Sequence, residues 1–329
     1  MAEPIPSPTT LRIASLNLFN YAAPPFSYYH PDDHYTALQW QEKNDWLAKQ
    51  LTALNPDVIG FEEVFSIEEL KIICLTHGLP YFATVTSPKI DEDDPFLFFR
   101  PVVAIASKYP FVSTHAVTAN QSLLSALNLP TEFKFNRLPI KALINIPDMG
   151  PTCFYIVHLK SKRPTPLSHY TDNQFEPHSY ANALINETIG RYHSDMQRTL
   201  ELALLFNDVI TTQANQHVHT IVMGDFNDQI NAEGLGFIFN SVPDDPNPEE
   251  ATLGLNDSYP LMTPRTPTHY YRDEGKVLDY ILTDKMLSHT DSKFVMQYHA
   301  LDQHIVNTSP QTQKISSDHA LVYIDIVKK

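Results

Sequence analysis

The chain of 329 residues has only two cysteines and no long hydrophobic run. Cys74 and Cys153 cannot form a structural zinc site by themselves, because such a site takes four ligands and neither cysteine has a histidine at ligand spacing. We interpret both as small buried apolar residues, and the sequence leaves a disulfide between them open. A membrane-spanning helix needs about 20 consecutive apolar residues, and no stretch reaches that length, so we expect no transmembrane segment.

Basic residues are also scarce. Lysine and arginine number 23 against 38 aspartates and glutamates, which gives a net charge of −15. Tight, sequence-indifferent binding of a polyanion relies on lysine and arginine to neutralise phosphates, and this balance argues against it. The same balance is compatible with a phosphoesterase whose metal ions supply local positive charge. Without a strongly basic surface, we expect a monomer that acts on accessible or small substrates.

The N-terminal segment lacks the features of a secretory signal. Met1–Thr10 is rich in proline and has no charged start followed by an apolar stretch. We therefore expect a tail at residues 1–10 and leave the compartment open, either cytoplasmic or secreted after removal of a signal. Hydrophobic residues make up 43% of the chain, enough for a substantial core. We predict one domain over residues 11–329, because strand signals resume after every proline-rich stretch.

Apolar runs rich in branched side chains predict strands, and apolar residues at helical spacing predict helices. Strand and helix alternate at the start and several strands follow later, which is typical of an α/β protein with mixed sheets covered by helices. The predicted helices are Thr36–Asn55, Ile67–Thr76 and Tyr180–Thr212. The predicted strands are Leu11–Leu16, Asp57–Phe61, Val102–Ala106, Leu138–Ile146, Cys153–Val157, Val218–Met223, Val277–Leu282 and Ala320–Ile326. The proline-rich stretches predicted as loops are Tyr28–Asp33, Pro88–Pro95, Arg163–Pro177 and Pro243–Pro248.

Polar groups lie at the ends of five predicted strands, where folds of this class usually build a site. Each group alone has a structural explanation, since an Asn or Asp after a strand is usually a turn residue and paired glutamates favour a helix N-terminus. All five in one chain are hard to obtain by chance, so we predict a functional site. The groups are Asn17, Glu62-Glu63, His158, Gly224-Asp225-Phe226-Asn227-Asp228, and Asp279 together with Ser317-Asp318-His319.

The order of these groups resembles the endonuclease/exonuclease/phosphatase superfamily, which includes deoxyribonucleases, apurinic endonucleases, neutral sphingomyelinases and inositol phosphatases. The phrases Gly224-Asp225-Phe226-Asn227 and Ser317-Asp318-His319 are together quite specific, and the resemblance extends from Leu11 to Val327. It implies a four-layer α/β/β/α sandwich of two mixed sheets. The chain is most similar to deoxyribonuclease-like, metal-dependent phosphoesterases of the bacterial type.

The resemblance implies a metal-binding half of the site. Glu63 matches the glutamate that binds the essential Mg²⁺, for which Mn²⁺ or Ca²⁺ are alternatives. Asn17 matches the asparagine beside it, and Asp318 resembles the companion carboxylate near the metal. These residue types suit the ion, because Mg²⁺ prefers oxygen ligands and keeps several of its waters.

The resemblance also implies a catalytic half. Asp225 and Asn227 match the pair that orients or deprotonates the attacking water. His319 matches the histidine that contacts the scissile phosphate, with Asp279 as its carboxylate partner. A carboxylate fixes the tautomer of an imidazole and favours its protonated form. His158 matches the second histidine of the deoxyribonuclease and sphingomyelinase branches.

Two positions depart from the family pattern. Glu62 stands where the family usually has glutamine, and Pro101 stands where a glycine is usual. An additional carboxylate at position 62 either adds a metal contact, raises the pKa of a neighbour by like-charge repulsion, or has no effect. Glu62 is therefore a further candidate metal ligand, and the number of metal ions stays open.

The segment after His158 bears on the substrate. Three cations follow the histidine within five residues, in His158-Leu159-Lys160-Ser161-Lys162-Arg163, and this pattern fits a phosphate-facing rim or a solvated loop equally well. We predict Lys160 as a substrate contact, and also Arg198 because the family often places an arginine on the following helix. The loop Thr165–Ser179 is expected to lie over the site.

These observations favour a Mg²⁺-dependent phosphodiesterase, with nucleic acid as the expected substrate. A lipid or small-molecule phosphoesterase is the alternative, because Tyr270-Tyr271 and Phe96–Phe99 are the nearest match to the aromatic hairpin of sphingomyelinases. Phe96–Phe99 fits better as a strand edge in the core. The inositol-phosphatase signature is absent around Asp279. All expected site groups are present, which argues against a catalytically inactive binding module.

Overall fold

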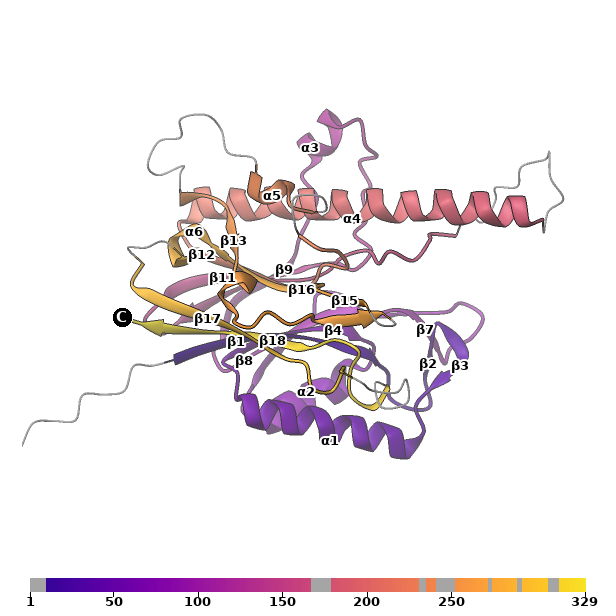
Figure 1. Ribbon diagram of the computed structural model, residues 1–329, viewed down its shortest axis with the longest axis horizontal. Coiled ribbons are helices and arrows are strands. Elements are labelled where there is room, and N and C mark those ends of the chain that lie inside the picture. Colours follow the sequence, from indigo (N-terminus) through magenta and orange to yellow (C-terminus); the bar gives the residue numbers. More distant parts are fainter. Residues whose placement is uncertain are drawn as a thin grey trace, which may run out of the picture.

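The computed structural model describes residues 10–166, 179–230, 235–240, 252–271, 274–288, 292–306 and 314–329. Two six-stranded sheets pack face to face, and helices cover both outer faces (Figure 1). The α/β class and the four-layer arrangement of two mixed sheets are confirmed. Both cysteines are buried, as expected, and both are free, so the disulfide that the sequence left open is absent. Within the described residues, no helix is both long and apolar enough to cross a lipid bilayer.

The first sheet has the strand order β17-β18-β1-β4-β8-β5. Its central strands β1 and β4 are parallel, and α1 connects them, while the other pairings in this sheet are antiparallel. Helices α1 and α2 cover its outer face (Figure 1). The elements are β1 (Thr10–Tyr21), α1 (Ala37–Leu54), β4 (Val58–Val64), α2 (Ile67–Thr76), β5 (Tyr81–Ala83), β8 (Val102–Ser107), β17 (Phe294–Leu301) and β18 (Leu321–Lys328).

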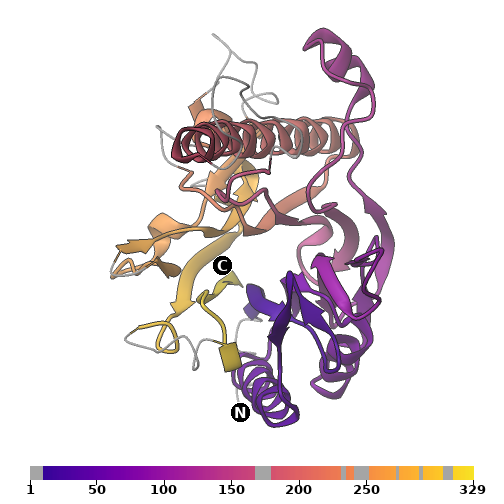
Figure 2. The same ribbon diagram turned by 90° about the vertical axis from the view of Figure 1, so that its right-hand side faces the viewer.

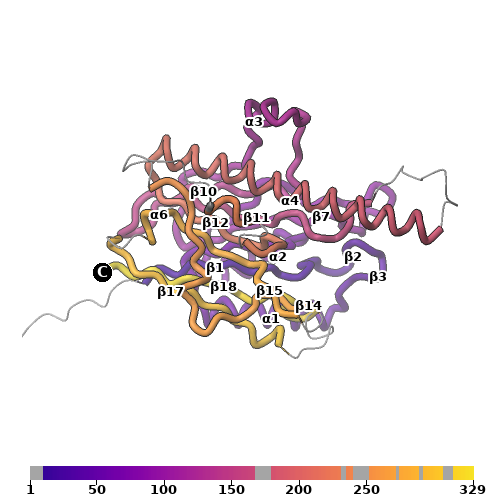
Figure 3. Tube along the Cα trace, turned by 45° about the horizontal axis from the view of Figure 1, so that its top comes forward, coloured from indigo at the N-terminus to yellow at the C-terminus, as the bar shows by residue number. Residues whose placement is uncertain are grey.

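The second sheet has the order β13-β16-β12-β11-β10-β9 and repeats this plan. Strands β11 and β12 are its parallel pair, and α4 connects them and runs along the outer face (Figure 2). The short α3 and its flanking segments extend beyond α4 (Figure 3). The elements are β9 (Phe111–Ala116), α3 (Gln121–Ala126), β10 (Ile140–Ile146), β11 (Gly150–His158), α4 (Tyr180–Gln216), β12 (His219–Asp225), α5 (Phe237–Asn240), β13 (Leu255–Asp257), β16 (Asp279–Asp284) and α6 (Lys285–Ser288).

Two small sheets complete the described fold. One has the order β3-β2-β7-β6 and the other pairs β14 with β15. The predicted loops at Tyr28–Asp33 and Pro88–Pro95 are therefore partly wrong, because short edge strands tolerate proline and charge. Most of the other two predicted loops, and most of Thr165–Ser179, lie outside the described residues. The elements are β2 (Ser27–Tyr28), β3 (His30–His34), β6 (Lys89–Ile90), β7 (Leu97–Arg100), β14 (His269–Tyr271), β15 (Glu274–Lys276) and a 3₁₀ turn at Tyr259–Leu261.

The helices begin and end at residues that satisfy their free backbone groups. Before α1, Thr36 and Gln39 form a reciprocal capping box, and Asn55 closes the helix with φ of 50°. Before α4, the Ser179 hydroxyl accepts from the backbone N–H of Asn182. Local sequence therefore determines these ends, and the predicted bounds of the three helices are close to those observed.

The core lies in three apolar layers, one between the sheets and one beneath each set of helices. Alternation along the central strands sends successive side chains to opposite layers. In β1, Ile13 enters the layer between the sheets, whereas Ala14 enters the layer beneath α1 and α2. Apolar burial stabilises by about 25 cal/mol per Å². The buried residues of the central layer include Ile13, Val58, Ile105, Ile144, Phe154, Ile221, Met223, Ile281 and Ile324.

The pairing of strands brings polar residues to one end of the sandwich. In the first sheet, Asn17 of β1 is opposite Glu62 of β4. In the second, Asp225 of β12 lies between His158 of β11 and Asp279 of β16. Both parallel pairs therefore place their carboxyl ends at the same site, where sheets of this kind bind ligands.

Candidate active site

A buried histidine–aspartate pair joins the two sheets. His319 Nδ1 donates to the two carboxylate oxygens of Asp279 at 3.0 and 2.9 Å, so Nδ1 carries a proton and Nε2 faces the site. Burial disfavours an imidazolium, but the negative charges of Asp279, Asp225 and Asp318 outweigh it and raise the pKa of His319 well above its ordinary value. His319 is therefore a fixed cation near neutral pH, suited to contact a phosphate oxygen.

The carboxylate of Asp225, at the end of the second sheet, accepts several hydrogen bonds. Its Oδ1 accepts from the backbone N–H of Asn227 at 2.7 Å, and its Oδ2 accepts from the amides of Asn17 and Asn227, each at 3.2 Å. Asn227 has φ of 53°, and this left-handed turn folds its amide back onto Asp225. Burial, together with repulsion by Asp279, raises the pKa of Asp225 to about 6, although His319 acts in the opposite direction. Such a carboxylate accepts a proton effectively near neutral pH.

His158 differs from His319 in charge. Its Nε2 lies 3.5 Å from Asp225 Oδ2. Burial, reinforced by the positive charges of Arg137 and His319, lowers the pKa of His158 well below its ordinary value. The ring is therefore neutral, and within the described residues its Nδ1 has no hydrogen-bond partner.

Two carboxylates at the end of the first sheet fit a divalent cation. Glu63 has φ of 59°, and its Oε2 accepts from the backbone N–H of Asn20 at 2.8 Å. Burial raises the pKa of Glu63, and the nearby charge of Asp318 adds to this effect. Asp318 Oδ1 is buried without a hydrogen-bond partner among the described residues. Mutually repelling carboxylate oxygens, one of them unsatisfied, are a donor set that suits Mg²⁺.

Other candidate ligands cluster around His319. One group that can supply three ligand atoms comprises Asp225, Asp279 and His319, and another comprises His269, Asp318 and His319. In each group the atoms lie within 4.8 Å of one another. Asn17 Oδ1 accepts from the backbone N–H of Phe19 at 3.0 Å, and its amide nitrogen donates to Asp225. A metal-binding role for Asn17 stays a prediction.

Glu62 lies beneath the site, between the two sheets. Its side chain is fully buried, Oε1 accepts from the Ser15 hydroxyl at 2.9 Å, and Oε2 has no partner in the described part of the chain. Burial, with repulsion from Asp279 and Asp225, raises the pKa of Glu62 well above its ordinary value. A protonated carboxyl has nearly the shape of the glutamine amide that the family usually has here, so Glu62 can occupy this position without adding a charge.

Lys160 and Arg198 hold the loop that follows β11. Lys160 Nζ donates to the carbonyls of Ser161 and Arg163, and burial lowers its pKa to about 8. The Arg198 side chain is 3% exposed, and its guanidinium donates to the Lys160 carbonyl and pairs with Asp228. Substrate binding by these two residues stays a prediction, and the contacts observed are those that brace a loop.

The sequence analysis missed two residues of the site. His269 lies at the start of β14, its ring centroid is 4.7 Å from that of His319, and its Nε2 is 3.8 Å from Asp318 Oδ2. Arg137 precedes β10 and acts electrostatically on both Glu63 and His158. Neither residue lies at the end of a predicted strand. His269 and His319 are paired by an isolated β-bridge. This is a tertiary contact, and the periodicity of the sequence does not predict it.

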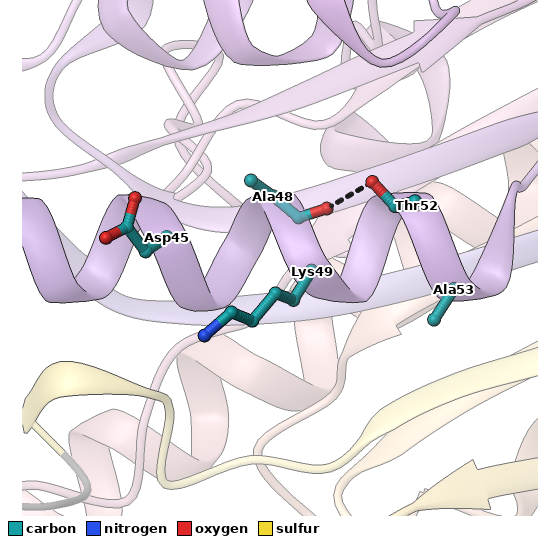
Figure 4. Close-up of a pocket in the computed structure, with 5 residues that line it drawn as sticks. All are labelled: Asp45, Ala48, Lys49, Thr52 and Ala53. Carbon is teal, nitrogen blue, oxygen red and sulfur yellow. Dashed lines mark hydrogen bonds between the residues drawn. The ribbon is translucent and has the colours of Figure 1, made fainter.

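Two hollows differ in their relation to this site. A groove of about 450 Å³ includes Arg137 in its wall, and the charge of Arg137 acts on Glu63 and His158. The other hollow, on the exposed face of α1, is lined by Asp45, Ala48, Lys49, Thr52 and Ala53 (Figure 4). Among the described residues, the Thr52 hydroxyl of the second hollow bonds only to the helix carbonyl of Ala48, and no candidate site residue lines that hollow.

Comparison with solved structures identifies proteins of the same architecture. The catalytic domain of human nocturnin with bound sulfate matches with a TM-score of 0.58 at 16% identity, over 97% of this chain and 95% of that one. TDP2 of D. rerio complexed with a single-strand DNA product matches with a TM-score of 0.55 at 12% identity, over 97% and 99%. An endonuclease/exonuclease/phosphatase family protein from Bacteroides thetaiotaomicron matches with a TM-score of 0.53 at 17% identity, over 98% and 99%.

Sequence comparison identifies the family. No curated protein sequence matches the chain at a significant level. The profile of the Endonuclease/Exonuclease/phosphatase family matches residues 14–319, nearly the whole chain. This match includes all the strand-terminal groups described above, from Asn17 to His319. The chain therefore belongs to the endonuclease/exonuclease/phosphatase family, whose members are hydrolases that act on phosphoester bonds.

Proposed function

We propose that this protein is a Mg²⁺-dependent phosphodiesterase that hydrolyses nucleic-acid phosphodiester bonds, with residues 11–329 acting as one catalytic domain. One observation supports this most strongly. The His319 imidazolium, held by Asp279, points Nε2 towards Asp225, whose pKa is raised to about 6, at a distance of 3.9 Å. A phosphate-binding cation thus stands beside a proton acceptor, as hydrolysis requires. The single-strand DNA product bound to D. rerio TDP2 supports nucleic acid as the substrate class.

The residues divide the chemistry between them. Asp225 orients a water molecule and accepts its proton, while Asn17 and Asn227 hold the carboxylate in place. His319 contacts the phosphate and donates a proton to the leaving oxygen. Glu63 and Asp318 would hold a divalent cation, which would supply positive charge to neutralise the phosphate oxygens.

A lipid phosphoesterase is the second candidate, and exposed aromatic residues favour it. Phe98 is buried, whereas Phe96 and Phe99 are 53% and 41% exposed and Tyr271 is 60% exposed. Exposed aromatic side chains of this kind are found where proteins contact a lipid interface. The location of Phe96–Phe99 in the core, as predicted from the sequence, is therefore correct for Phe98 but wrong for Phe96 and Phe99.

A substrate panel separates these functions. It comprises plasmid DNA, RNA, sphingomyelin, bis(p-nitrophenyl) phosphate and a phosphomonoester, each with Mg²⁺, Mn²⁺, Ca²⁺ or EDTA. We expect cleavage of nucleic acid and of bis(p-nitrophenyl) phosphate with Mg²⁺, and none with EDTA. Activity that survives EDTA would exclude the metal-dependent mechanism. Hydrolysis of sphingomyelin without cleavage of nucleic acid would favour the lipid function.

A further inference from the structure

The 450 Å³ groove beside the catalytic centre is positively charged in a strongly acidic protein. Lys89, Arg100, Lys134 and Arg137 line it, and among the described residues no aspartate or glutamate does. The chain as a whole carries a net charge of −15. Four cations without a lining carboxylate are therefore a local reversal of the overall charge, and such reversals attract anionic ligands.

Three of the four cations of this groove have no side-chain partner in the described part of the protein. Among the described residues, Lys89, Arg100 and Lys134 form no side-chain hydrogen bond or ion pair. Arg137 donates one long hydrogen bond, of 3.3 Å, to the Leu159 carbonyl, and its Nε is buried without a partner. Cations that stabilise a fold are usually paired, so Lys89, Arg100 and Lys134 are free to bind a ligand.

The groove leads to the reaction centre. Arg137 lines the groove and donates to the Leu159 carbonyl, which also accepts from the side-chain amide of Asn227 at 3.0 Å. The other three cations come from β6, from the end of β7 and from the segment before β10, so they extend the charge away from the centre. This geometry suits a chain of phosphates rather than a single one.

An aromatic residue completes the groove. Phe133 lies in its wall, half-buried, with its ring edge-on to buried Phe135 at a centroid distance of 5.3 Å. Single-stranded nucleic acids bind through cationic grooves that follow the backbone and aromatic rings that stack on bases.

From this arrangement we propose that the groove binds the single-stranded nucleic acid that flanks the scissile bond, with phosphates on Lys89, Arg100 and Lys134 and a base stacked on Phe133. The proposal rests on the phosphodiesterase function proposed above and narrows its substrate to an unpaired strand. The groove residues that would bind the strand are not catalytic residues. Strand binding by the groove and phosphodiesterase activity can therefore be tested, and can fail, separately.

Charge reversal at two exposed positions tests the proposal. The variant is Lys89→Glu/Lys134→Glu, and the matched control is Lys49→Glu/Lys293→Glu, which makes the same change in net charge at exposed residues elsewhere. Binding of fluorescent oligothymidylates of roughly 2, 4, 8 and 12 nucleotides is measured by anisotropy in EDTA, so that no cleavage occurs. We expect wild-type affinity to rise with length, and the groove variant to bind the longer strands about 10-fold more weakly than the control.

The salt dependence gives a second measurement. Each phosphate contact on a single strand contributes about 0.7 to the slope of log affinity against log salt, so the groove variant should lose about 1.4 from that slope. A Phe133→Ala variant should weaken binding about 10-fold without changing the slope, because stacking releases no counterions. Equal affinities and slopes in the groove variant and the control would overturn the proposal.

Two further comparisons separate the causes of failure. Tighter binding of a duplex than of a single strand, or of phosphatidylglycerol vesicles than of either, would overturn the assignment to single-stranded nucleic acid. With Mg²⁺ present, the ratio of oligonucleotide cleavage to bis(p-nitrophenyl) phosphate cleavage should fall in the groove variant. If wild type cleaves neither substrate, the proposed function fails, while the binding data in EDTA still decide whether the groove holds a strand.

Discussion

The two parallel strand pairs that build the site have the same plan but differ in how completely the carboxylates at their ends are satisfied. In the second sheet, Asp225 accepts three hydrogen bonds from within the protein. At the end of the first sheet, Asp318 Oδ1 and Glu62 Oε2 have no partner among the described residues. We infer that hydrogen bonds preorganise the water-activating half, whereas the other half depends on a cation for Asp318 and on a proton for Glu62.

The largest expected effect on catalytic rate comes from removing His319 or Asp225, which lie where the two halves of the site meet. His319→Ala removes the phosphate-facing cation, and Asp225→Ala removes the proton acceptor. Each should lower kcat about 10³-fold or more, because positioned acid–base groups and charge stabilisation both act in the transition state. Steady-state kinetics on bis(p-nitrophenyl) phosphate measures the loss, and circular dichroism verifies that both variants fold. Near-normal turnover in either folded variant would show that its assigned role is incorrect.

The next effect concerns the half that depends on a cation. Glu63→Gln should raise the Mg²⁺ concentration for half-maximal activity about 10- to 100-fold, while saturating Mg²⁺ restores much of the rate. Thermal stabilisation by Mg²⁺ gives a readout independent of activity and should weaken in parallel. If Glu63→Gln leaves the metal requirement unchanged and Glu62→Gln raises it, Glu62 is the ligand.

A smaller effect on stability and activity is expected from the loop after β11, which borders the half of the site that contains Asp225. Arg198 is buried and bonded to Asp228 and to the Lys160 carbonyl, so Arg198→Met leaves polar partners unsatisfied. We expect a loss of about 1–3 kcal/mol in the free energy of unfolding, with a decrease of about 10-fold in kcat/KM as the loop loosens. A substrate contact would behave differently, with an increase in KM and an unchanged melting temperature. The two measurements together decide between bracing and binding.

The fold was largely predictable from the sequence because its central elements carry local signals. All eight predicted strands are present, and Ile67–Thr76 is a helix with the predicted bounds. Thr36 and Asn55 mark the ends of α1 through capping that needs no tertiary contact. Most of the strands that were missed have two to five residues, often with proline or charge as in β3, so they contain no periodic pattern and depend on pairing with neighbours. The edge strands β9 and β17, of six and eight residues, were also missed, because polar residues interrupt their apolar runs.

Site residues could be predicted from the sequence only where they lie at the end of a predicted strand. The pairing of Asp279 with His319, 40 residues apart, was expected from the family resemblance and is present at 2.9 Å. His269 and the cationic groove could not be found in this way, because tertiary packing assembles them from segments without a shared motif. The bracing contacts of Arg198 likewise depend on α4 packing against the loop.

The smallest effect on rate, and the sharpest test of the difference between the halves, is expected at Glu62. Its pKa is raised well above the ordinary 4.5, first by burial and then by Asp279 and Asp225. The folded protein therefore retains a proton that the unfolded chain releases above pH 4.5. Stability is then fully present below that pH and falls as the pH rises towards the pKa of the folded state. Glu62→Gln removes this dependence while keeping the shape of the side chain.

Denaturant unfolding in EDTA at a series of pH values measures the effect. The stability advantage of Glu62→Gln over wild type should be near zero at about pH 4 and should grow to about 1–3 kcal/mol by about pH 7, with kcat changed only a few-fold. A constant difference across this range would mean that Glu62 is ionised in the folded protein. An ionised Glu62 beside Asp225 and Asp279 would need a cation of its own, and the site would then hold a metal ion beneath the catalytic pair as well as at Glu63.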